Sequence, residues 1–160
     1  FSNYNNVCTS QPAVMFSAGS HGEGTDKAIK HTAQNVFDTG EFVVNVVTEP
    51  LLKKMLRTSD QIPRDESEFD HADIKRAEST TVTPPRVADA NIHLECTFQD
   101  SLRVFDNRLI VGKVEHIHLS EDVMSDEKID MDKLDTVGRI GGPDYTRTDP
   151  LGVTYRDYYG

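Results

Sequence analysis

Apolar residues at helical spacing change directly into a strand-like run in the first third of the chain. Ala33, Val36 and Phe37 share one stripe, which predicts a short amphipathic helix that packs on one side. Gly40 follows, and a residue without a Cβ takes the left-handed conformation that ends a helix at little cost. The run 42–47 is almost entirely apolar and rich in valine, which predicts a strand buried on both faces.

Three further segments have patterns that predict strands. Residues 12–16 are apolar after a proline, 91–98 alternate between apolar and polar positions, and 109–119 form the longest strand. Gly112 indicates a bulge in that last strand, and 106–108 indicate a turn before it. Several antiparallel strands with a few short helices predict an α+β domain dominated by β structure. The strand spacing fits both a sandwich and a barrel.

The remaining segments are more polar. Residues 50–57 predict a short amphipathic helix, and 59–76 carry charges of both signs, as expected for a solvated helix and loop. The acidic segment 122–135 is expected to be partly helical, and it lacks the spacing of a calcium-binding loop. The glycine-rich segment 18–26 lacks the dinucleotide fingerprint, so we expect a flexible connector there rather than a phosphate cradle.

Composition and charge restrict the class of partner. The chain has 160 residues, which predicts one domain over 1–160, and its formal net charge is −10. This charge argues against nucleic acid and against an anionic membrane surface as partners. The longest apolar run is too short to span a bilayer. Because Phe1 is not an initiator methionine, we expect the natural protein to have residues before it.

Cysteine usage suggests the compartment. Cys8 and Cys96 lie far apart and form no CxxC motif, so we expect two reduced thiols in a cytoplasmic protein. A metal site is not expected either. His116 and His118 share a face of the predicted strand 109–119, but only Glu95 and remoter histidines are available to complete a set of ligands.

Two segments carry candidate anion-binding chemistry. Lys30, His31 and Thr32 place a cation, an imidazole and a hydroxyl at a predicted helix start, where unpaired N–H groups and the helix dipole favour an anion. The alternative is an ordinary cap formed by Thr32 beside a solvated lysine. In 138–145, Arg139 offers a planar donor fork, and a glycine pair permits close approach to a ligand or another subunit. A plain surface turn is the alternative there.

Six segments occur in a characteristic order: FSNYNNVCTSQPAVMFSAG, KHTAQN, TGEFVVN, LECTF, IVGKVEHIHL and GRIGGPDY. Their succession resembles the flavin reductase-like family of FMN-binding split β-barrels over nearly the whole chain. The resemblance selects the split β-barrel over the sandwich. It also places the helix start at His31 rather than near Lys27. The family usually has aspartate at this position, so His31 removes the usual carboxylate cap.

The resemblance implies an FMN-containing oxidoreductase in which NADH or NADPH reduces the flavin. Electrons would then pass to a downstream acceptor or an oxygenase. In the family two subunits associate with the flavin near their interface, so a homodimer is expected. Two rival functions remain open from sequence alone. One is an FMN-binding electron carrier that does not turn over nicotinamide, and the other is an acidic interaction domain without cofactor.

The resemblance also implies which residues contact the cofactor. The opening segment would address the flavin ring, the helix start would hold the phosphate, and 138–145 would close the site. Residues 59–76 would form a lid in which Phe69 and His71 face the substrate. The expected flavin-binding residues are Ser2, Asn3, Tyr4, Asn5, Ser10, Ser17, Lys30, His31, Thr32, Asn35, Arg139 and Tyr145.

Overall fold

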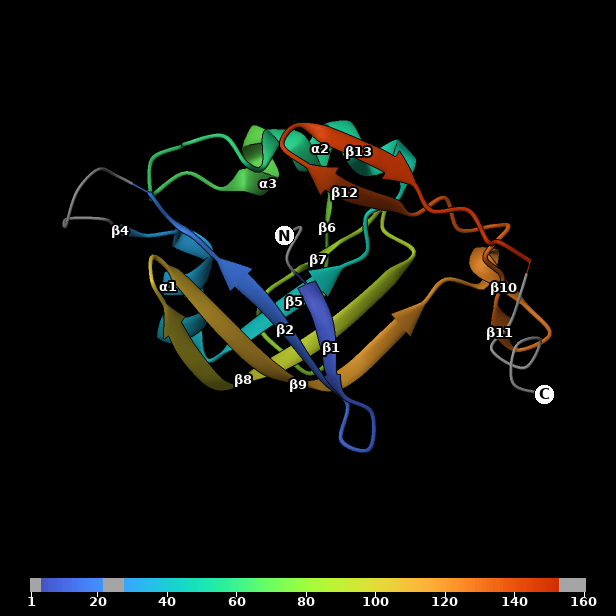
Figure 1. Cartoon of the computed structure of the whole chain (residues 1–160), viewed down its shortest axis with the longest axis horizontal. Coiled ribbons are helices and arrows are strands. Elements are labelled where there is room, and N and C mark those ends of the chain that lie inside the picture. Colours follow the sequence, from blue (N-terminus) through green and yellow to red (C-terminus); the bar gives the residue numbers. More distant parts are fainter. Residues whose placement is uncertain (1–3, 22–27, 153–160) are drawn as a thin grey trace.

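One antiparallel sheet forms the centre of the molecule. The computed structural model describes residues 4–21 and 28–152, and within them the largest sheet has five strands. Figure 1 shows these strands crossing one another steeply as the sheet coils. In spatial order they are β1 (Tyr4–Cys8), β2 (Ala13–Ala18), β9 (Asn107–Leu119), β8 (Ile92–Val104) and β5 (Glu41–Asn45).

Short helices and hairpins surround this sheet. The helical segments are α1 (His31–Thr39), the 3-10 turn η1 (Glu49–Leu51), α2 (Leu52–Arg57), α3 (Glu68–His71) and the 3-10 turn η2 (Glu121–Val123). The paired short strands are β3 (Ser20–His21) with β4 (Ala28–Ile29), β6 (Arg76–Ala77) with β7 (Arg86–Val87), β10 (Met124–Ser125) with β11 (Lys128–Ile129), and β12 (Val137–Gly141) with β13 (Asp144–Arg147). The glycine-rich connector falls largely outside the described residues.

The long β8–β9 hairpin contains two register shifts, one with its extra residue in β8 between Phe98 and Asp100, and one with its extra residue, Glu115, in β9. The first shift falls at the pair formed by Phe98 and Gly112, so the bulge is at the predicted place, with its extra residue in β8. Gly112 also has a packing role. A Cβ at this position would lie 2.3 Å from the ring of Phe42. That ring also meets Phe16 edge-on, with centroids 5.3 Å apart, so an aromatic side chain fills the space above the glycine.

Helix α1 is held by the apolar stripe that the sequence predicts. Ala33 and Val36 are buried in one cluster with residues of β2, β5, β8 and β9. Gly40 ends the helix at φ 72°, and its N–H donates to the carbonyl of Val36. Phe37 is only partly covered, since it is 36 % exposed and packs edge-on against Phe98. The helix start at His31 agrees with the resemblance.

Two predictions about local structure need correction. The run 42–47 is not a strand buried on both faces. It forms the edge strand β5, which ends at Asn45, and within that strand only Phe42 is buried. The acidic segment 122–135 contains the end of one 3-10 turn and the β10–β11 hairpin, with no α-helix. Its apolar residues Val123 and Leu134 form a second small core with β8.

A buried carboxylate ties the loop between β6 and β7 to the sheet. Glu95 of β8 has no exposed surface. Its oxygens accept hydrogen bonds from the N–H groups of Thr80 and Thr81 at 2.7 and 2.6 Å, and from Nε2 of His118 at 2.5 Å. The guanidinium of Arg86 lies 4.0 Å away. Burial raises the pKa of the Glu95 carboxyl, but the bonds from Thr81, Thr80 and His118 outweigh it and hold the pKa well below its usual range.

We expect Glu95→Gln to destabilise the fold by at least about 2 kcal/mol, because buried donors then lose a charged acceptor. A depressed folded-state pKa means that this stabilisation is present above the unfolded pKa near 4.5 and is lost as the pH falls below it. Below that pKa, the wild type loses up to about 1.4 kcal/mol of its free energy of unfolding per pH unit through this carboxylate. Urea unfolding between pH 7 and pH 3 should therefore show a shallower pH dependence in the variant than in the wild type.

Glu115→Gln is the matched control for this prediction. Glu115 lies on the neighbouring strand, but its carboxylate is at the surface and pairs with Lys113. We expect its loss to change the free energy of unfolding by less than about 1 kcal/mol. Parallel pH profiles for the wild type and Glu95→Gln would contradict the role assigned to the buried carboxylate.

Candidate functional site

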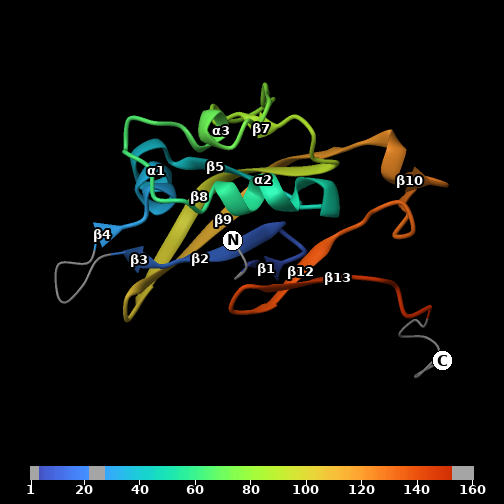
Figure 2. The ribbon, with the colours of Figure 1, turned by 90° about the horizontal axis from the view of Figure 1, so that it is seen from above.

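A cleft of about 690 Å³ opens beside the start of α1. Figure 1 shows α2, α3 and the β12–β13 hairpin along the same end of the sheet, and Figure 2 shows α2 between the other two. The described residues that line the cleft are Lys30, His31, Thr32, Asn45, Val47, Met55, Thr58, Ser59, Asp60, Gln61, Ile62, Glu68, Phe69, Ile74, Val87, Val137, Arg139 and Tyr145.

The positive end of α1 borders this cleft. Lys30, His31 and Thr32 all line it. Lys30 is the residue before the helix, with extended backbone at φ −61° and ψ 149°, and its side chain makes no capping hydrogen bond. Thr32 is the second residue of the helix, so the interpretation of Thr32 as the cap is wrong. An α-helix leaves its first N–H groups without intrahelical acceptors and carries partial positive charge there.

The β12–β13 hairpin brings Arg139 and Tyr145 to the same cleft. It is joined to the segment after β5 by the N–H of Val137, which donates to the carbonyl of Val47 at 3.3 Å. An ion pair between Arg147 and Glu49 fixes the far side of the hairpin. Tertiary contacts therefore place side chains more than 100 positions apart in the sequence beside the start of α1.

The glycine pair of this hairpin serves the turn itself. Gly142 has a φ of 52°, which favours glycine, and its carbonyl accepts from Nε and Nη2 of Arg139 at 2.9 and 2.6 Å. Apart from the adjacent residues, no heavy atom in the described part of the chain lies within 4 Å of a Cβ built at Gly141 or Gly142. The close approach to a ligand or to another subunit therefore stays a prediction. Arg139 combines a position in the cleft with support of its own turn.

The lid expected at 59–76 contributes an apolar wall. Met55, Ile62, Phe69 and Ile74 line the cleft. Phe69 is held from below, because its N–H donates to Oγ of Ser67 at 3.3 Å and the guanidinium carbon of Arg76 lies 4.9 Å from its ring centroid. His71, which was expected to face the substrate, is not among the lining residues. Its Nε2 lies 2.8 Å from Oδ2 of Asp60.

The opposite wall is connected to the buried Glu95 cluster. The N–H of Val87 donates to Oδ1 of Asn45 at 2.8 Å, and both residues line the cleft. Nε2 of His93 lies 2.8 Å from the carbonyl of Val87. Burial lowers the pKa of His93, so its imidazole is neutral at pH 7 and Nε2 carries the proton that is donated. Nδ1 is then the acceptor that faces Arg86 at 3.5 Å.

Other predicted contact residues lie elsewhere. Tyr4 and Asn5 are exposed on β1, Ser17 is on β2, and Asn35 is exposed on α1. Oγ of Ser10, in the β1–β2 turn, lies 3.3 Å from the sulfur of Cys8. None of these five predicted contact residues is among the described residues that line the cleft. Ser2 and Asn3 lie outside the described residues.

Sequence reasoning missed the acidic members of the site. Asp60 and Glu68 line the cleft opposite Lys30 and Arg139. Both belong to the segment whose many charges suggested a solvated excursion, and a charge pattern alone does not show which carboxylates turn inward. In the sequence, only the family resemblance pointed to this segment, because it implies that residues 59–76 form a lid.

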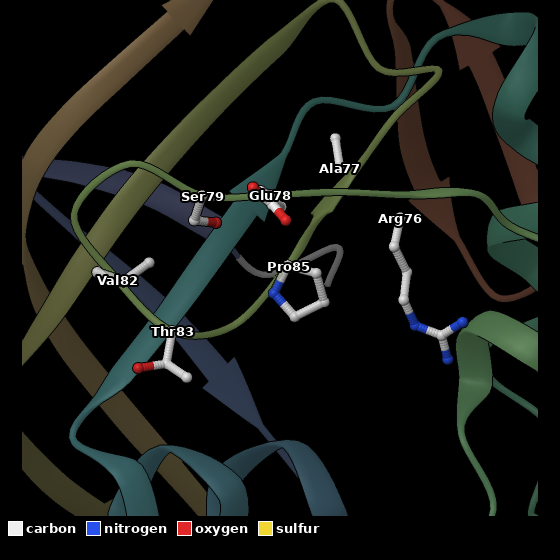
Figure 3. A pocket seen from close by; sticks show the side chains of 7 residues that line it. All are labelled: Arg76, Ala77, Glu78, Ser79, Val82, Thr83 and Pro85. Atoms are coloured by element: carbon white, nitrogen blue, oxygen red, sulfur yellow. The ribbon is translucent and has the colours of Figure 1, made fainter.

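A second cavity, of about 400 Å³, lies beside the loop between β6 and β7. Figure 3 shows that its side chains are small or aliphatic apart from Arg76 and Glu78, and that Arg76 points away from the others toward α3. There the guanidinium bonds both carboxylate oxygens of Asp70, at 2.7 and 2.9 Å. The one cation of this cavity is therefore used within the protein, and the larger cleft is the better candidate site.

The described residues show no other site of obvious chemistry. Among them no three His, Cys, Asp or Glu side chains cluster as a metal site would require. Cys8 and Cys96 are both free, and burial raises the pKa of Cys96 to about 12. No helix in the described part of the chain has the length and hydropathy needed to cross a membrane.

Comparison with known proteins identifies the family. The flavin reductase like domain matches residues 1–134. A protein of Aquifex aeolicus is 34 % identical over 149 residues, which cover 92 % of this chain and 74 % of that protein. The chain therefore belongs to the flavin reductase-like family. Lys30, His31 and Thr32 fall within the matched region, whereas Arg139 and Tyr145 follow it.

Solved structures support the same fold. Nitrilotriacetate monooxygenase component B from Bacillus cereus superposes with a TM-score of 0.85 at 26 % identity, covering 96 % of this chain and 77 % of that one. Pseudomonas fluorescens 2-nitrobenzoate 2-nitroreductase superposes with a TM-score of 0.80 at 25 % identity, covering 94 % of this chain and 73 % of that one. A flavin reductase with a split barrel domain from Shewanella frigidimarina has a TM-score of 0.81 at 19 % identity, and the match covers 96 % of this chain and 75 % of that one. The fold is the split β-barrel, as expected.

Proposed function

We propose that this protein binds FMN in the cleft and acts as an oxidoreductase of the flavin reductase type. Reduced nicotinamide would reduce the flavin, and the electrons would pass to a separate acceptor. The observation that carries the proposal is one cleft that combines the positive end of α1 with aromatic and aliphatic walls. Its volume lies within the range of about 300–1,000 Å³ that is usual for cofactor sites.

The residues of the cleft fit the two ends of such a cofactor. Lys30, Thr32 and the first N–H groups of α1 would hold the phosphate, since cations and helix starts favour phosphate oxygens. Arg139 adds a cation to the same cleft. The aromatic rings of Phe69 and Tyr145 offer surfaces suited to a planar ring system. His31 replaces a carboxylate cap by an imidazole, which leaves no negative charge on this residue to oppose the phosphate.

The isoalloxazine supplies hydride and electron transfer when it is bound, so the chain need supply only binding, orientation and exclusion of water. The apolar lid side chains Met55, Ile62 and Ile74 would exclude water from one side of the cleft. Val47, Val87 and Val137 make the facing side apolar. The support of Val87 by His93 and Asn45 keeps that wall in place.

We also propose a homodimer. Ile117 and Leu119 point to one face of the β8–β9 hairpin, because they are two positions apart on β9 and pair with Leu94 and Ile92. They are 49 % and 43 % exposed. The exposed face of an antiparallel sheet is normally polar, so apolar side chains there favour contact with a second copy. The flavin is proposed to lie near this interface, as the family resemblance implies.

The function is tested by colour and by anaerobic reduction. The purified protein, reconstituted with FMN, should show the visible bands of a flavoprotein, and a reduced nicotinamide should bleach them within seconds to minutes without oxygen. A coloured protein that dithionite bleaches but neither NADH nor NADPH reduces would be an electron carrier. A protein that stays colourless after reconstitution would contradict flavin binding altogether.

Lys30→Ala should weaken FMN binding by about 1–3 kcal/mol, or roughly 5- to 150-fold, because a charge-assisted phosphate contact is lost. Riboflavin, which has no phosphate, should bind both proteins almost equally. Calorimetry or flavin fluorescence quenching measures both affinities. Lys53→Ala is the matched control, since Lys53 is an exposed lysine of α2 outside the cleft. Equal losses for FMN and riboflavin would remove Lys30 from the phosphate site.

The dimer is tested by Ile117→Glu, which places a charge on the proposed interface. Sedimentation should show a dimer for the wild type and a monomer for the variant at micromolar concentration, with an unchanged far-ultraviolet dichroism spectrum. Glu115→Gln, at an exposed position of the same strand, is the control and should remain a dimer. A wild-type monomer with full flavin occupancy would contradict the proposal.

A further inference from the structure

The charges that line the cleft are unevenly placed. Lys30 and Arg139 lie on the side formed by α1 and the β12–β13 hairpin, whereas Asp60 and Glu68 come from the lid. The cleft thus brings together two cations and two carboxylates, and His31 also lines it. Aspartate and glutamate are ionised at neutral pH. The lid side of the cleft is therefore negative.

The cations of the lid do not balance these carboxylates. Residues 52–76 are all described, and none of their lysines or arginines lines the cleft. Four of these side chains are engaged elsewhere. Lys54 pairs with Asp73, Arg57 donates to the carbonyl of His71, Arg64 pairs with Asp38 and Arg76 pairs with Asp70.

A bound phosphate makes the cleft as a whole negative. A phosphate monoester carries about −1.5 to −2 charges at pH 7, and it would sit at the cations that line the cleft. Once Lys30 and Arg139 face that phosphate, no lysine or arginine among the described lining residues remains for Asp60 and Glu68, and Asp60 keeps only its contact with Nε2 of His71 at 2.8 Å. A second ligand that approaches the lid therefore meets a negative surface, on a chain whose formal net charge is −10.

From this arrangement we infer that the site uses NADH in preference to NADPH, with Asp60 and Glu68 as the residues that set the preference. The inference rests on the proposed function. NADPH differs from NADH by one 2′-phosphate, which adds about two negative charges. Two carboxylates acting on a doubly charged group disfavour it on the order of tenfold at low salt. Neither carboxylate need touch the nucleotide, because repulsion acts across water.

The test measures binding as well as turnover. Calorimetry on the FMN-loaded protein in 50 mM salt gives the affinities for NAD⁺ and NADP⁺, and anaerobic stopped-flow gives the reduction rates with NADH and NADPH. The wild type should favour the nucleotide without the 2′-phosphate by about tenfold in both measurements. The preference should narrow at 500 mM salt, where the Debye length is only about 4 Å.

Asp60→Asn combined with Glu68→Gln should bring both ratios close to one, because the repulsion that acts on the 2′-phosphate is removed. Asp60 is 55 % exposed, so the variant should fold, and stoichiometric FMN absorbance verifies this. Asp65→Asn is the control, an exposed carboxylate of the same lid outside the cleft, and it should keep the wild-type ratio.

Two results would overturn the inference. One is a wild type that reacts with NADPH as fast as with NADH, which would leave the proposed function intact. The other is a double variant with an unchanged ratio, which would remove Asp60 and Glu68 from the account. A flavin-loaded protein that neither binds nor reacts with either nucleotide would instead refute nicotinamide use itself, and the inference would fall with it.

Discussion

The packing of α1 against the barrel is the constraint on which the candidate site depends. Ala33 and Val36 are buried among β2, β5, β8 and β9, and the left-handed turn at Gly40 leads directly into β5. These contacts fix both ends of a helix of only nine residues. An isolated helix of that length would not persist in water. Because the helix is fixed on the sheet, its positive end is also held in place. The cleft lies beside this end.

A second constraint holds the wall that faces this helix. Glu95 accepts hydrogen bonds from the loop between β6 and β7, and Arg86 and His93 extend the cluster to Val87 at the cleft. A buried carboxylate is tolerable only when its oxygens are satisfied. The cluster therefore acts as a rigid support. It also gives His118, one of the two histidines of β9, a structural role as a partner of Glu95.

Local pattern was sufficient for some elements and insufficient for others. The stripe at Ala33 and Val36 and the glycine at 40 define α1, because one helix buries one stripe. The alternation in 91–98 likewise predicts β8. The valine-rich run after Gly40 led to the wrong prediction of a strand buried on both faces, because the same composition suits a half-covered edge strand. Burial there is decided by which strands become neighbours, and the sequence of one strand does not contain that information.

The site was predictable only in part for the same reason. Lys30, His31 and Thr32 are recognisable from the helix start, and Arg139 and Tyr145 came from a motif. Their meeting with Asp60 and Glu68 depends on tertiary contacts such as the Arg147–Glu49 ion pair. The most direct measurement is a crystal structure of the protein grown with FMN. The account predicts the phosphate within hydrogen-bonding distance of Lys30 and the first N–H groups of α1, with the ring between Phe69 and Tyr145. Flavin bound outside this cleft would contradict it.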